Sequence, residues 1–324
     1  MGVKKLKSSL LKTIHKKFPN KIRIIGIDIL LYLYKYIYSA SEEPLYNLFT
    51  MISKFLIVGI IPLFVFDGKP IKEKKTEILE RRNKKLKINN KIIRMKEKLT
   101  LDPSNKALRS SYIKLLKKQN ILDKDIINNC KKLMNLMKVP YITAKTEADF
   151  TCCRLYLDGV IQGCLTEDMD FLLFGCIRNF HFKNGQIIEY NLLTTLKSLD
   201  ITFSQFQDFC LLLGCDYIKK YTTDDNKAIL QKIKLHKSIK NWADNSKDPD
   251  FKNHLTKCLE IKNILNKTLI DEFVDISTIE LDFNKNKIDK SHLTTFFSLV
   301  IHKNSFKFHL TNTFNDVIYK INTI

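Results

Sequence analysis

Seven acidic side chains occupy apolar contexts in a chain that is otherwise strongly basic. They lie in the segments IGIDIL, FVFDGK, TEADF, LTEDMDF and LLGCDY, and they are Asp28, Asp67, Glu147, Asp149, Asp168, Asp170 and Asp216. Carboxylates without clustered histidine or cysteine are the ligands that Mg²⁺ or Mn²⁺ prefers, whereas zinc favours nitrogen and sulfur. More carboxylates than one ion can use predict two ions, an arrangement that supports in-line phosphodiester hydrolysis.

Each of these acids, taken alone, has a more ordinary explanation. An aspartate after a strand commonly caps a helix or closes a turn. The joint pattern is harder to explain in this way, because it contains two spaced pairs, Glu147-x-Asp149 and Asp168-x-Asp170. If all seven converge, their mutual repulsion is costly unless cations compensate it.

Strands and helices alternate along most of the chain. Apolar runs predict strands at 22–28, 61–66, 139–143 and 160–166, and periodic segments predict helices at 45–58, 125–138, 146–157 and 203–213. The segment 178–190 predicts a hairpin around Asn184-Gly185. Thr146 and Asp149 resemble a capping box, and Gly214 is a candidate helix C-terminus.

This alternation predicts an α/β fold with a mostly parallel central sheet flanked by helices. Ligands of such sheets bind beyond the carboxyl ends of the strands. Asp28, Asp67 and Asp168 follow three of the predicted strand ends, so we expect them in that crevice.

The composition favours a polyanionic partner. The chain has 55 Lys and Arg against 34 Asp and Glu and a pI near 9.5, which suits nucleic acid or an anionic membrane. The longest uncharged apolar run, 55–66, is too short to span a bilayer, and lysines interrupt the N-terminal apolar stretch, so we expect no membrane segment or signal peptide. The eight cysteines lack CxxC spacing and are expected to be reduced core residues of an intracellular protein.

A highly charged segment at 69–123 follows Asp67. Between residues 69 and 98 there are 13 Lys and Arg against 4 Glu, and LDPS at 101–104 breaks the segment into two helical halves. A lysine-rich helix is often no more than a solvated face. Its position beside a predicted acidic site favours a role in drawing phosphates toward that site.

Six ordered blocks resemble the structure-specific 5′ nucleases of the flap endonuclease family: MGVKKL, IGIDILLYLY, FVFDGKP, TEADF, TEDMDFLLFG and LLGCDY. The resemblance covers about residues 1–240 and implies a PIN-like nuclease core with a helical arch. It implies two Mg²⁺ ions, with Mn²⁺ able to replace them. One ion would be held by Asp28, Asp67, Glu147 and Asp149, and the other by Asp168, Asp170 and Asp216. Asp149 stands where the family commonly has Glu, so we expect one of its contacts to run through water.

The same resemblance implies the contacts with DNA. Residues 69–123 would form the arch beneath which a single-stranded flap passes. Lys74 and Arg81, seven positions apart and so expected on one helix face, would grip the scissile phosphate. The other implied contacts are a stacking role for Tyr34, an N-terminal role for Gly2 and strand-steering roles for Arg82, Lys84 and Lys85. Tyr34 lies in a run of four alternating tyrosines, most of which should serve packing.

The match weakens after Asp216. The family has a glycine-rich helix-two-turn-helix there, which grips duplex DNA with a potassium ion, whereas residues 217–233 contain no glycine. This departure weakens the expectation of K⁺. Lys219, Lys220 and Lys227 could still contact phosphates against the opposing charges of Asp224 and Asp225, and binding would then depend steeply on salt.

The chain is expected to divide into a nuclease core at 1–240 and a helical C-terminal extension at 241–324. The core would contain an N-terminal region (1–92), the arch (69–123) and an internal region (124–240). Leu293, Phe296 and Phe297 resemble a motif that docks sliding clamps, although such apolar spacing is more often core. We expect a monomer at sites of DNA replication, in the nucleus of a cell or in the cytoplasm or virion of a cytoplasmic DNA virus.

The leading hypothesis is a Mg²⁺-dependent 5′ flap endonuclease and 5′→3′ exonuclease acting in DNA replication, repair or recombination. A relative specialised for recombination junctions is a close alternative. A catalytically silent DNA-binding scaffold would be expected to have lost some of the seven acids, and all are present. A ribosome-associated basic protein would explain the charge but not the acidic pairs.

Overall fold

A computed structural model describes residues 3, 6–19, 21–38, 44–119, 124–279, 287–301 and 312–323. These residues divide into two compact units, each assembled from separate stretches of sequence. The sheet unit consists of Met1–Ile29, Ile60–Lys74 and Pro140–Leu281. The helical unit consists of Leu30–Gly59, Lys75–Val139 and Asp282–Ile324. The expected boundary at residue 240 stays a prediction.

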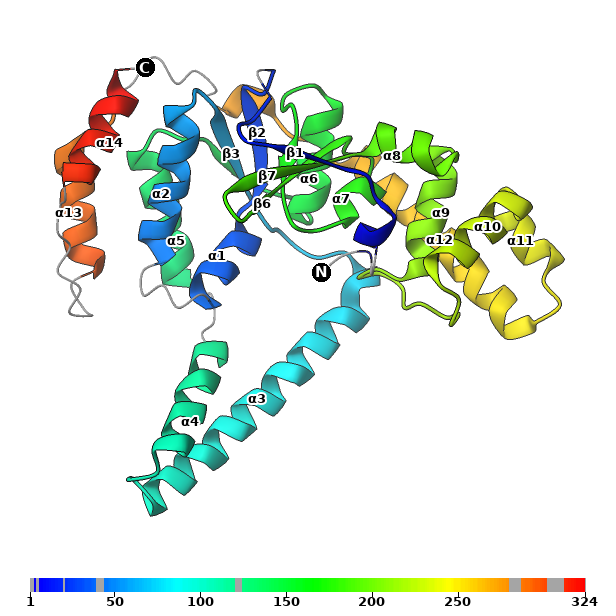
Figure 1. Ribbon diagram of the computed structural model, residues 1–324, viewed down its shortest axis with the longest axis horizontal. Helices are drawn as coiled ribbons and strands as arrows, with labels where there is room; N and C mark the ends of the chain where they lie inside the picture. The colour runs from blue at the N-terminus through cyan, green and yellow to red at the C-terminus, as the bar shows by residue number, and fades with distance from the viewer. Residues whose placement is uncertain are drawn as a thin grey trace. The chain divides into compact units, whose positions relative to one another are not determined.

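Seven strands form one mixed sheet in the sheet unit, in the order β1-β7-β6-β5-β2-β3-β4 (Figure 1). The parallel strands are β2 (Ile24–Asp28), β3 (Ile61–Phe66), β4 (Tyr141–Thr143), β5 (Cys164–Leu165) and β6 (Arg178–Lys183). The antiparallel strands β7 (Gln186–Asn191) and β1 (Lys12–His15) extend the sheet beyond β6. The predicted α/β class with a mostly parallel sheet is confirmed.

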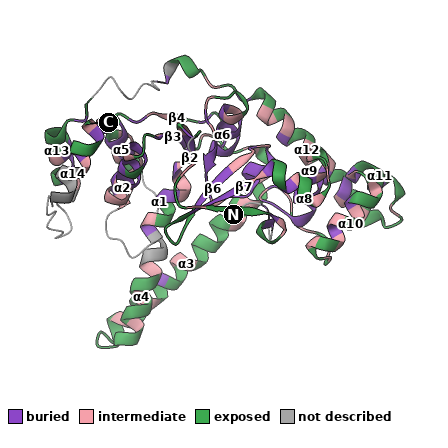
Figure 2. Ribbon diagram, turned by 45° about the horizontal axis from the view of Figure 1, so that its top comes forward, coloured by how far each residue is buried: buried purple, intermediate pink, exposed green. Residues whose placement is uncertain are grey.

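The central strands are buried on both faces, as their uninterrupted apolar sequences predict. Ile25 and Ile27 of β2 and Leu63, Phe64 and Val65 of β3 are fully buried, and the middle of each strand is purple in Figure 2. The predicted strand at 160–166 is shorter than expected, since only Cys164–Leu165 pairs with its neighbours. All eight cysteines are free and buried, which confirms the prediction of reduced core residues.

The helices of the sheet unit follow the strands in the chain. They are α6 (Ala148–Leu157), α7 (Asp170–Leu173), α8 (Leu192–Leu199), α9 (Phe203–Leu213), α10 (Asn226–His236), α11 (Ile239–Asn245) and α12 (Pro249–Asp271), with the 3₁₀ turns η1 (Leu6–Ser9), η2 (Lys72–Lys74) and η3 (Ile276–Thr278). The hairpin between β6 and β7 turns at Asn184 and Gly185, both with positive φ, as predicted. Gly214 ends α9 with φ 84°, and a Cβ there would lie 2.7 Å from the Lys220 amide nitrogen.

The capping box predicted from Thr146 and Asp149 is wrong. The N-cap of α6 is Glu147, and its side chain makes no capping hydrogen bond. The Ala148 amide instead donates to Asp67 Oδ1 at 2.8 Å, so the cap comes from a distant segment. A local cap was predicted because Thr146 and Asp149 are close in sequence, but Asp67, in the loop after β3, caps the helix instead.

The helical unit contains α1 (Ile29–Tyr38), α2 (Pro44–Ile57), α3 (Lys75–Leu101), α4 (Lys106–Gln119), α5 (Lys124–Leu136), α13 (Lys290–Ile301) and α14 (Asn312–Asn322). The first residue of α1, Ile29, belongs to the sheet unit. Leu293 and Phe297 are fully buried and Phe296 is 8% exposed. The Phe297 ring packs edge-on against Phe49 of α2, with centroids 5.6 Å apart. These side chains form core, which opposes their use as a clamp-docking motif.

Helices α3 and α4 lie side by side as an antiparallel pair, which Figure 1 shows in cyan and green-cyan. The break falls at 102–105, where Pro103 interrupts the helical sequence and Asn105 Oδ1 accepts from the Leu108 amide at 2.9 Å. Most residues of α3 are exposed, and Ile92 is its one residue classed as buried. The predicted split of the charged segment into two helices is confirmed.

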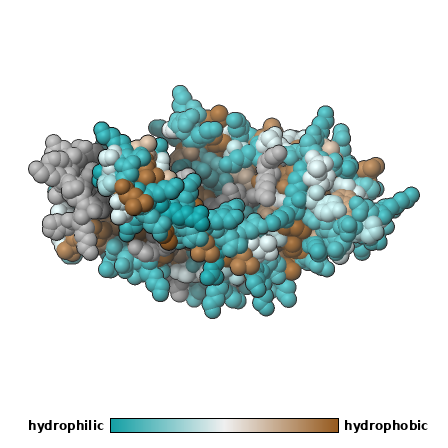
Figure 3. Space-filling view, turned by 90° about the horizontal axis from the view of Figure 1, so that it is seen from below, coloured by the Kyte–Doolittle hydropathy of each residue, from teal (hydrophilic) through white to brown (hydrophobic). Residues whose placement is uncertain are grey.

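None of the described helices combines the length and apolar character needed to cross a membrane. The face drawn in Figure 3 is mostly hydrophilic, with apolar side chains in small scattered groups. Single exposed apolar residues of this kind are normal on a protein surface.

Candidate active site

The acidic residues gather at one edge of the sheet unit because β5, β2 and β3 are adjacent parallel strands. Asp28 is the last residue of β2, Asp67 follows β3 directly, and Asp168 lies three residues beyond β5. Carboxyl ends of parallel strands meet at a common edge, so these three positions are neighbours by topology. The predicted placement of these three acids at strand ends is therefore confirmed.

The close approach of the β3 and β4 ends requires glycine after Asp67. A Cβ on Gly68 would lie 2.0 Å from the Ala144 carbonyl oxygen and 2.7 Å from that of Lys145. The Gly68 amide also donates to the Thr146 carbonyl at 2.7 Å. The glycine of FVFDGK thus allows Asp67 to reach the N-terminus of α6, which carries Glu147 and Asp149.

Four of the acids are buried despite their charge. Glu147 is 4%, Asp149 7%, Asp168 7% and Asp170 1% exposed. Asp28 and Asp216 are half-buried, and Asp67 is exposed. Buried carboxylates are uncommon unless they are paired or hold a cation, so this burial separates these positions from ordinary surface acids.

Burial and mutual repulsion disfavour the charged forms of three of these acids. Burial raises the pKa of Asp149 well above its usual range, and the neighbouring Asp168 raises it further. Burial likewise raises the pKa of Asp168 and Asp170, and Asp216 adds to both shifts. Added positive charge at this edge would reverse these shifts, because it stabilises the ionised carboxylates.

Lys74 supplies part of that positive charge. Its Nζ donates to Glu147 Oε2 and lies 3.8 Å from Asp216 Oδ2. Burial alone would lower the pKa of Lys74, but Asp149, Glu147 and Asp216 raise it above its usual value. Tyr217 lies beside the pair: its hydroxyl donates to Glu147 Oε2 at 3.4 Å, and its ring centroid is 5.5 Å from Nζ.

Two features of the acidic site suit a hard divalent cation: its side chains offer oxygen ligands, and one buried carboxylate lacks hydrogen-bond partners of ordinary geometry. Neither oxygen of the buried Asp170 carboxylate has a described partner at ordinary hydrogen-bond distance and angle, although the nearby Val3 amide lowers the pKa of this carboxyl. An orphaned buried carboxylate is the kind of group that a cation satisfies. No three His, Cys, Asp or Glu side chains of the described residues are arranged closely enough to hold one ion. The acids fit a divalent cation in the type of oxygen ligand that they offer.

Two of the acids also have local structural roles. Asp67 caps α6, and Asp168 Oδ1 accepts from the Asp170 amide at 3.0 Å. The Asp168 amide in turn donates to Thr166 Oγ1, also at 3.0 Å. These contacts fix the carboxylates in position and leave further lone pairs on each for a cation.

The helical unit carries the other expected contacts with phosphates. Arg81, Arg82, Lys84 and Lys85 are exposed on α3, and Arg81 Nε donates to Glu77. Lys74 ends η2, directly before α3 begins at Lys75, and the expectation that it shares a helix face with Arg81 stays a prediction. Tyr34 of α1 is 39% exposed, whereas Tyr32 is buried. Gly2 lies outside the described residues.

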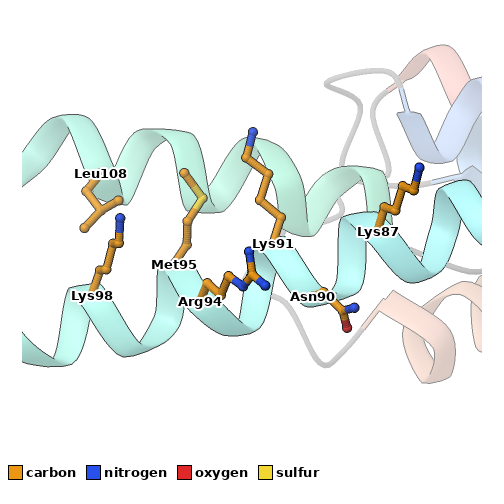
Figure 4. Close-up of a pocket in the computed structure, with 7 residues that line it drawn as sticks. All are labelled: Lys87, Asn90, Lys91, Arg94, Met95, Lys98 and Leu108. Carbon is orange, nitrogen blue, oxygen red and sulfur yellow. The ribbon is translucent and has the colours of Figure 1, made fainter.

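A basic groove runs between α3 and α4. It is lined by Lys87, Asn90, Lys91, Arg94, Met95, Lys98 and Leu108. Figure 4 shows the Lys87, Lys91 and Lys98 side chains rising from α3 toward α4. In the described part of the chain these lysines form no ion pair, which leaves their charge available to an anion.

The segment after Asp216 is organised by its own acids. Asp225 caps α10 by accepting from the Ala228 amide at 2.8 Å, and Asp224 pairs with Lys232 at 2.6 Å. Lys220 Nζ donates to the Asp224 carbonyl, while Lys219 and Lys227 are exposed. The carboxylate of Asp225 occupies the helix N-terminus that a phosphate would otherwise use.

Sequence reasoning missed three side chains that contact this site. The Tyr217 hydroxyl donates to Glu147, and the Thr166 hydroxyl accepts from the Asp168 amide. Glu272 accepts from Thr146 and Thr151, which lie on either side of Glu147 and Asp149. Tyr217 was adjacent to a candidate acid and could have been found from that position. No local signal marked Glu272, which lies 125 residues after Glu147 in the chain.

Family models and solved structures match most of this chain. The XPG N-terminal domain matches residues 1–88 and the XPG I-region matches residues 138–216. Flap endonuclease-1 from Methanococcus jannaschii has a similar fold, with a TM-score of 0.66 and 19% identity over 98% of each chain. The Holliday junction-resolving enzyme GEN1, solved with product DNA and a Mg²⁺ ion, aligns with a TM-score of 0.57 and 14% identity over 92% of this chain and 73% of that chain. The two solved structures share the fold of this chain.

A sequence relative gives the narrower assignment. Flap endonuclease 1 from Enterocytozoon bieneusi is 31% identical over 266 residues, which cover 74% of this chain and 72% of that protein. The chain therefore belongs to the flap endonuclease family, and it is a nuclease.

Proposed function

We propose that the protein is a structure-specific 5′ nuclease that hydrolyses phosphodiester bonds in branched DNA, cutting 5′ flaps as an endonuclease and free 5′ ends as a 5′→3′ exonuclease. The observation that carries this proposal is the burial of Glu147, Asp149, Asp168 and Asp170 at one sheet edge, where Lys74 Nζ donates to Glu147. Membership of the flap endonuclease family supports the choice of substrate. A silent scaffold would have no need of four buried acids at this edge.

Two Mg²⁺ ions, which Mn²⁺ could replace, are the proposed cofactors. Asp28, Asp67, Glu147 and Asp149 would hold one ion, and Asp168, Asp170 and Asp216 the other. When bound, such ions lower the pKa of water and offset charge on the scissile phosphate. The orphaned Asp170 oxygens support this assignment.

Lys74 is proposed to act on the scissile phosphate. In the described structure it is held by Glu147 and Asp216, so its ammonium group stands among the acids before any phosphate arrives. A phosphate entering this edge would give Lys74 an alternative anionic partner. Tyr217 would then keep a hydrogen bond on Glu147 while the lysine moves. Arg81 is the proposed second cation on the phosphate, released from Glu77.

The grip on DNA is proposed to rest mainly on side chains rather than on backbone amides. Arg82, Lys84 and Lys85 would steer the 5′ strand, and Lys219, Lys220 and Lys227 would contact duplex phosphates. The capping of α10 by Asp225 supports this choice and argues against a potassium site there. Tyr34 is proposed to stack on a base near the cleavage point, and Gly2 to lie near the same point.

We place this activity in DNA replication, repair or recombination inside the cell, carried out by a monomer. Junction resolution is the competing substrate class, because GEN1 shares the fold and acts on Holliday junctions. A comparison of 5′-labelled flap, nicked and four-way substrates in Mg²⁺ separates the two. We expect the flap to be cut faster than the four-way junction. Faster cutting of the four-way junction would assign the protein to junction resolution instead.

A further inference from the structure

Glu272 lies immediately after α12 and is buried, with 4% of its surface exposed. It accepts two side-chain hydrogen bonds, from Thr151 Oγ1 at 2.5 Å and from Thr146 Oγ1 at 3.1 Å. All three residues belong to the sheet unit, so the contact lies within one compact body.

The two threonines bracket the acids of the first proposed ion site. Thr146 precedes Glu147, and Thr151 follows Asp149 by two positions. One carboxylate therefore holds both ends of the short stretch that presents Glu147 and Asp149. No acid of the Asp168–Asp170 pair makes a described hydrogen bond to Glu272.

This stretch depends on contacts from elsewhere in the chain. The Glu147 side chain does not cap α6, and the Ala148 amide is bound by Asp67 instead. The carboxylates of Asp168, Asp28 and Asp67 each repel that of Asp149 across this edge. A helix start under such repulsion needs an anchor on its opposite side, and the contact between α12 and α6 provides one.

We propose that Glu272 is a positioning residue that anchors the first turn of α6 and so fixes Glu147 and Asp149 at the acidic edge. The role in cation binding rests on the proposed function, whereas the anchoring of α6 does not. Groups that orient metal ligands through hydrogen bonds commonly change metal affinity by 10–100-fold when removed, which sets the scale of the effect.

The test uses the full chain and two measurements that require no cleavage. Mn²⁺ affinity is measured from the paramagnetic resonance signal of the free ion, and amide hydrogen exchange is measured for residues 147–152. Glu272→Ala is expected to weaken Mn²⁺ binding about tenfold and to speed exchange in this stretch. Glu272→Gln is expected to restore both, because its amide can accept from one hydroxyl and donate to the other. Thr151→Val should repeat the loss and Thr151→Ser should not.

Asp208→Asn is the matched control. Asp208 is also a buried carboxylate, but it holds α12 and α11 through Lys262 at 2.6 Å and the Ile239 amide at 3.0 Å. This variant should lower thermal stability without changing Mn²⁺ affinity. Wild-type exchange rates at 147–152 in both Glu272→Ala and Thr151→Val would overturn the anchoring role, as would equal losses in Asp208→Asn. Absence of Mn²⁺ binding by the wild type would overturn the proposed function, and the exchange data would still decide the anchor.

Discussion

Single residues at the acidic edge serve the fold and the site together. Asp67 is a helix cap, as the ordinary reading of a strand-end aspartate predicts, and it also stands beside Glu147 and Asp149. Asp168 binds the first amide of α7. Helix capping and cation binding use different lone pairs of one carboxylate, so the same aspartate can serve in both roles.

Among single residues, Lys74 gives the sharpest test of a direct role in cleavage. Lys74→Gln should lower the rate of flap cleavage by about 100-fold or more, the usual cost of losing one preorganised electrostatic contact in a transition state. DNA affinity should change by less than about threefold, because many other cations contribute to binding. Single-turnover rates and fluorescence anisotropy measure the two quantities.

Lys69→Gln is the matched control for Lys74. Lys69 is an exposed lysine in the same loop, and its charged group has no described contact with the acids. Both quantities should stay near wild type in this variant. An equal loss of rate in the two variants would mean that Lys74 acts only through general attraction of DNA.

At the scale of elements, the sequence predicted much of what positions the site. The bounds of β3, α9 and the β6–β7 hairpin agree with the predictions because apolar runs, Gly214 and Asn184-Gly185 are local signals. The strand β1 was not predicted, since Lys12–His15 is mostly exposed and pairs only at the edge of the sheet. The cap of α6 and the anchor at Glu272 could not be predicted, because both depend on contacts between distant segments.

Helix α13 gives a prediction about packing. Phe297→Ala should lower the free energy of unfolding by about 3–5 kcal/mol, as for other large core truncations, because Phe297 is fully buried against Phe49. Leu299→Ala on the same helix should change it by less than about 0.5 kcal/mol, since Leu299 is 74% exposed. Denaturant titration measures both. Unchanged stability in Phe297→Ala would restore the docking motif as an explanation of these residues.

The sheet edge formed by β1, β6 and β7 gives a prediction about pH. Burial raises the pKa of Glu189, but hydrogen bonds from Arg178 at 2.7 and 3.1 Å outweigh it, so the pKa lies below its ordinary value of 4.5. A lowered pKa means that the folded state favours the ionised form. The resulting stability is present above pH 4.5 and is lost as pH falls through the folded-state value.

Glu189→Gln should therefore cost about 2 kcal/mol of unfolding free energy at neutral pH, the scale of hydrogen bonds to a charged group. The difference from wild type should shrink as the pH falls below 4.5. Denaturant titrations across this range measure it. A difference that is constant with pH would show that the Arg178 contact contributes packing rather than charge.

Across the whole molecule, the excess of positive charge should govern DNA binding. Replacing Arg82, Lys84 and Lys85 with Gln should reduce the slope of log affinity against log salt by about 2–3, if each cation contacts one phosphate. The matched control replaces Lys252, Lys257 and Lys267, exposed lysines on α12 that are not among the proposed DNA contacts. An equal change of slope in the two triple variants would mean that net charge alone, and not the arch, determines affinity.

The central claim is that the carboxylates at the sheet edge form a metal-dependent nuclease centre. It is tested most directly by cleavage of 5′-labelled flap DNA in Mg²⁺ with wild type, Asp168→Asn, Asp170→Asn and the double variant. Wild type is expected to cut near the junction only with the divalent ion, and the double variant to lose at least about 100-fold in rate while still binding DNA. Full cleavage by the double variant would show that these carboxylates do not form the nuclease centre.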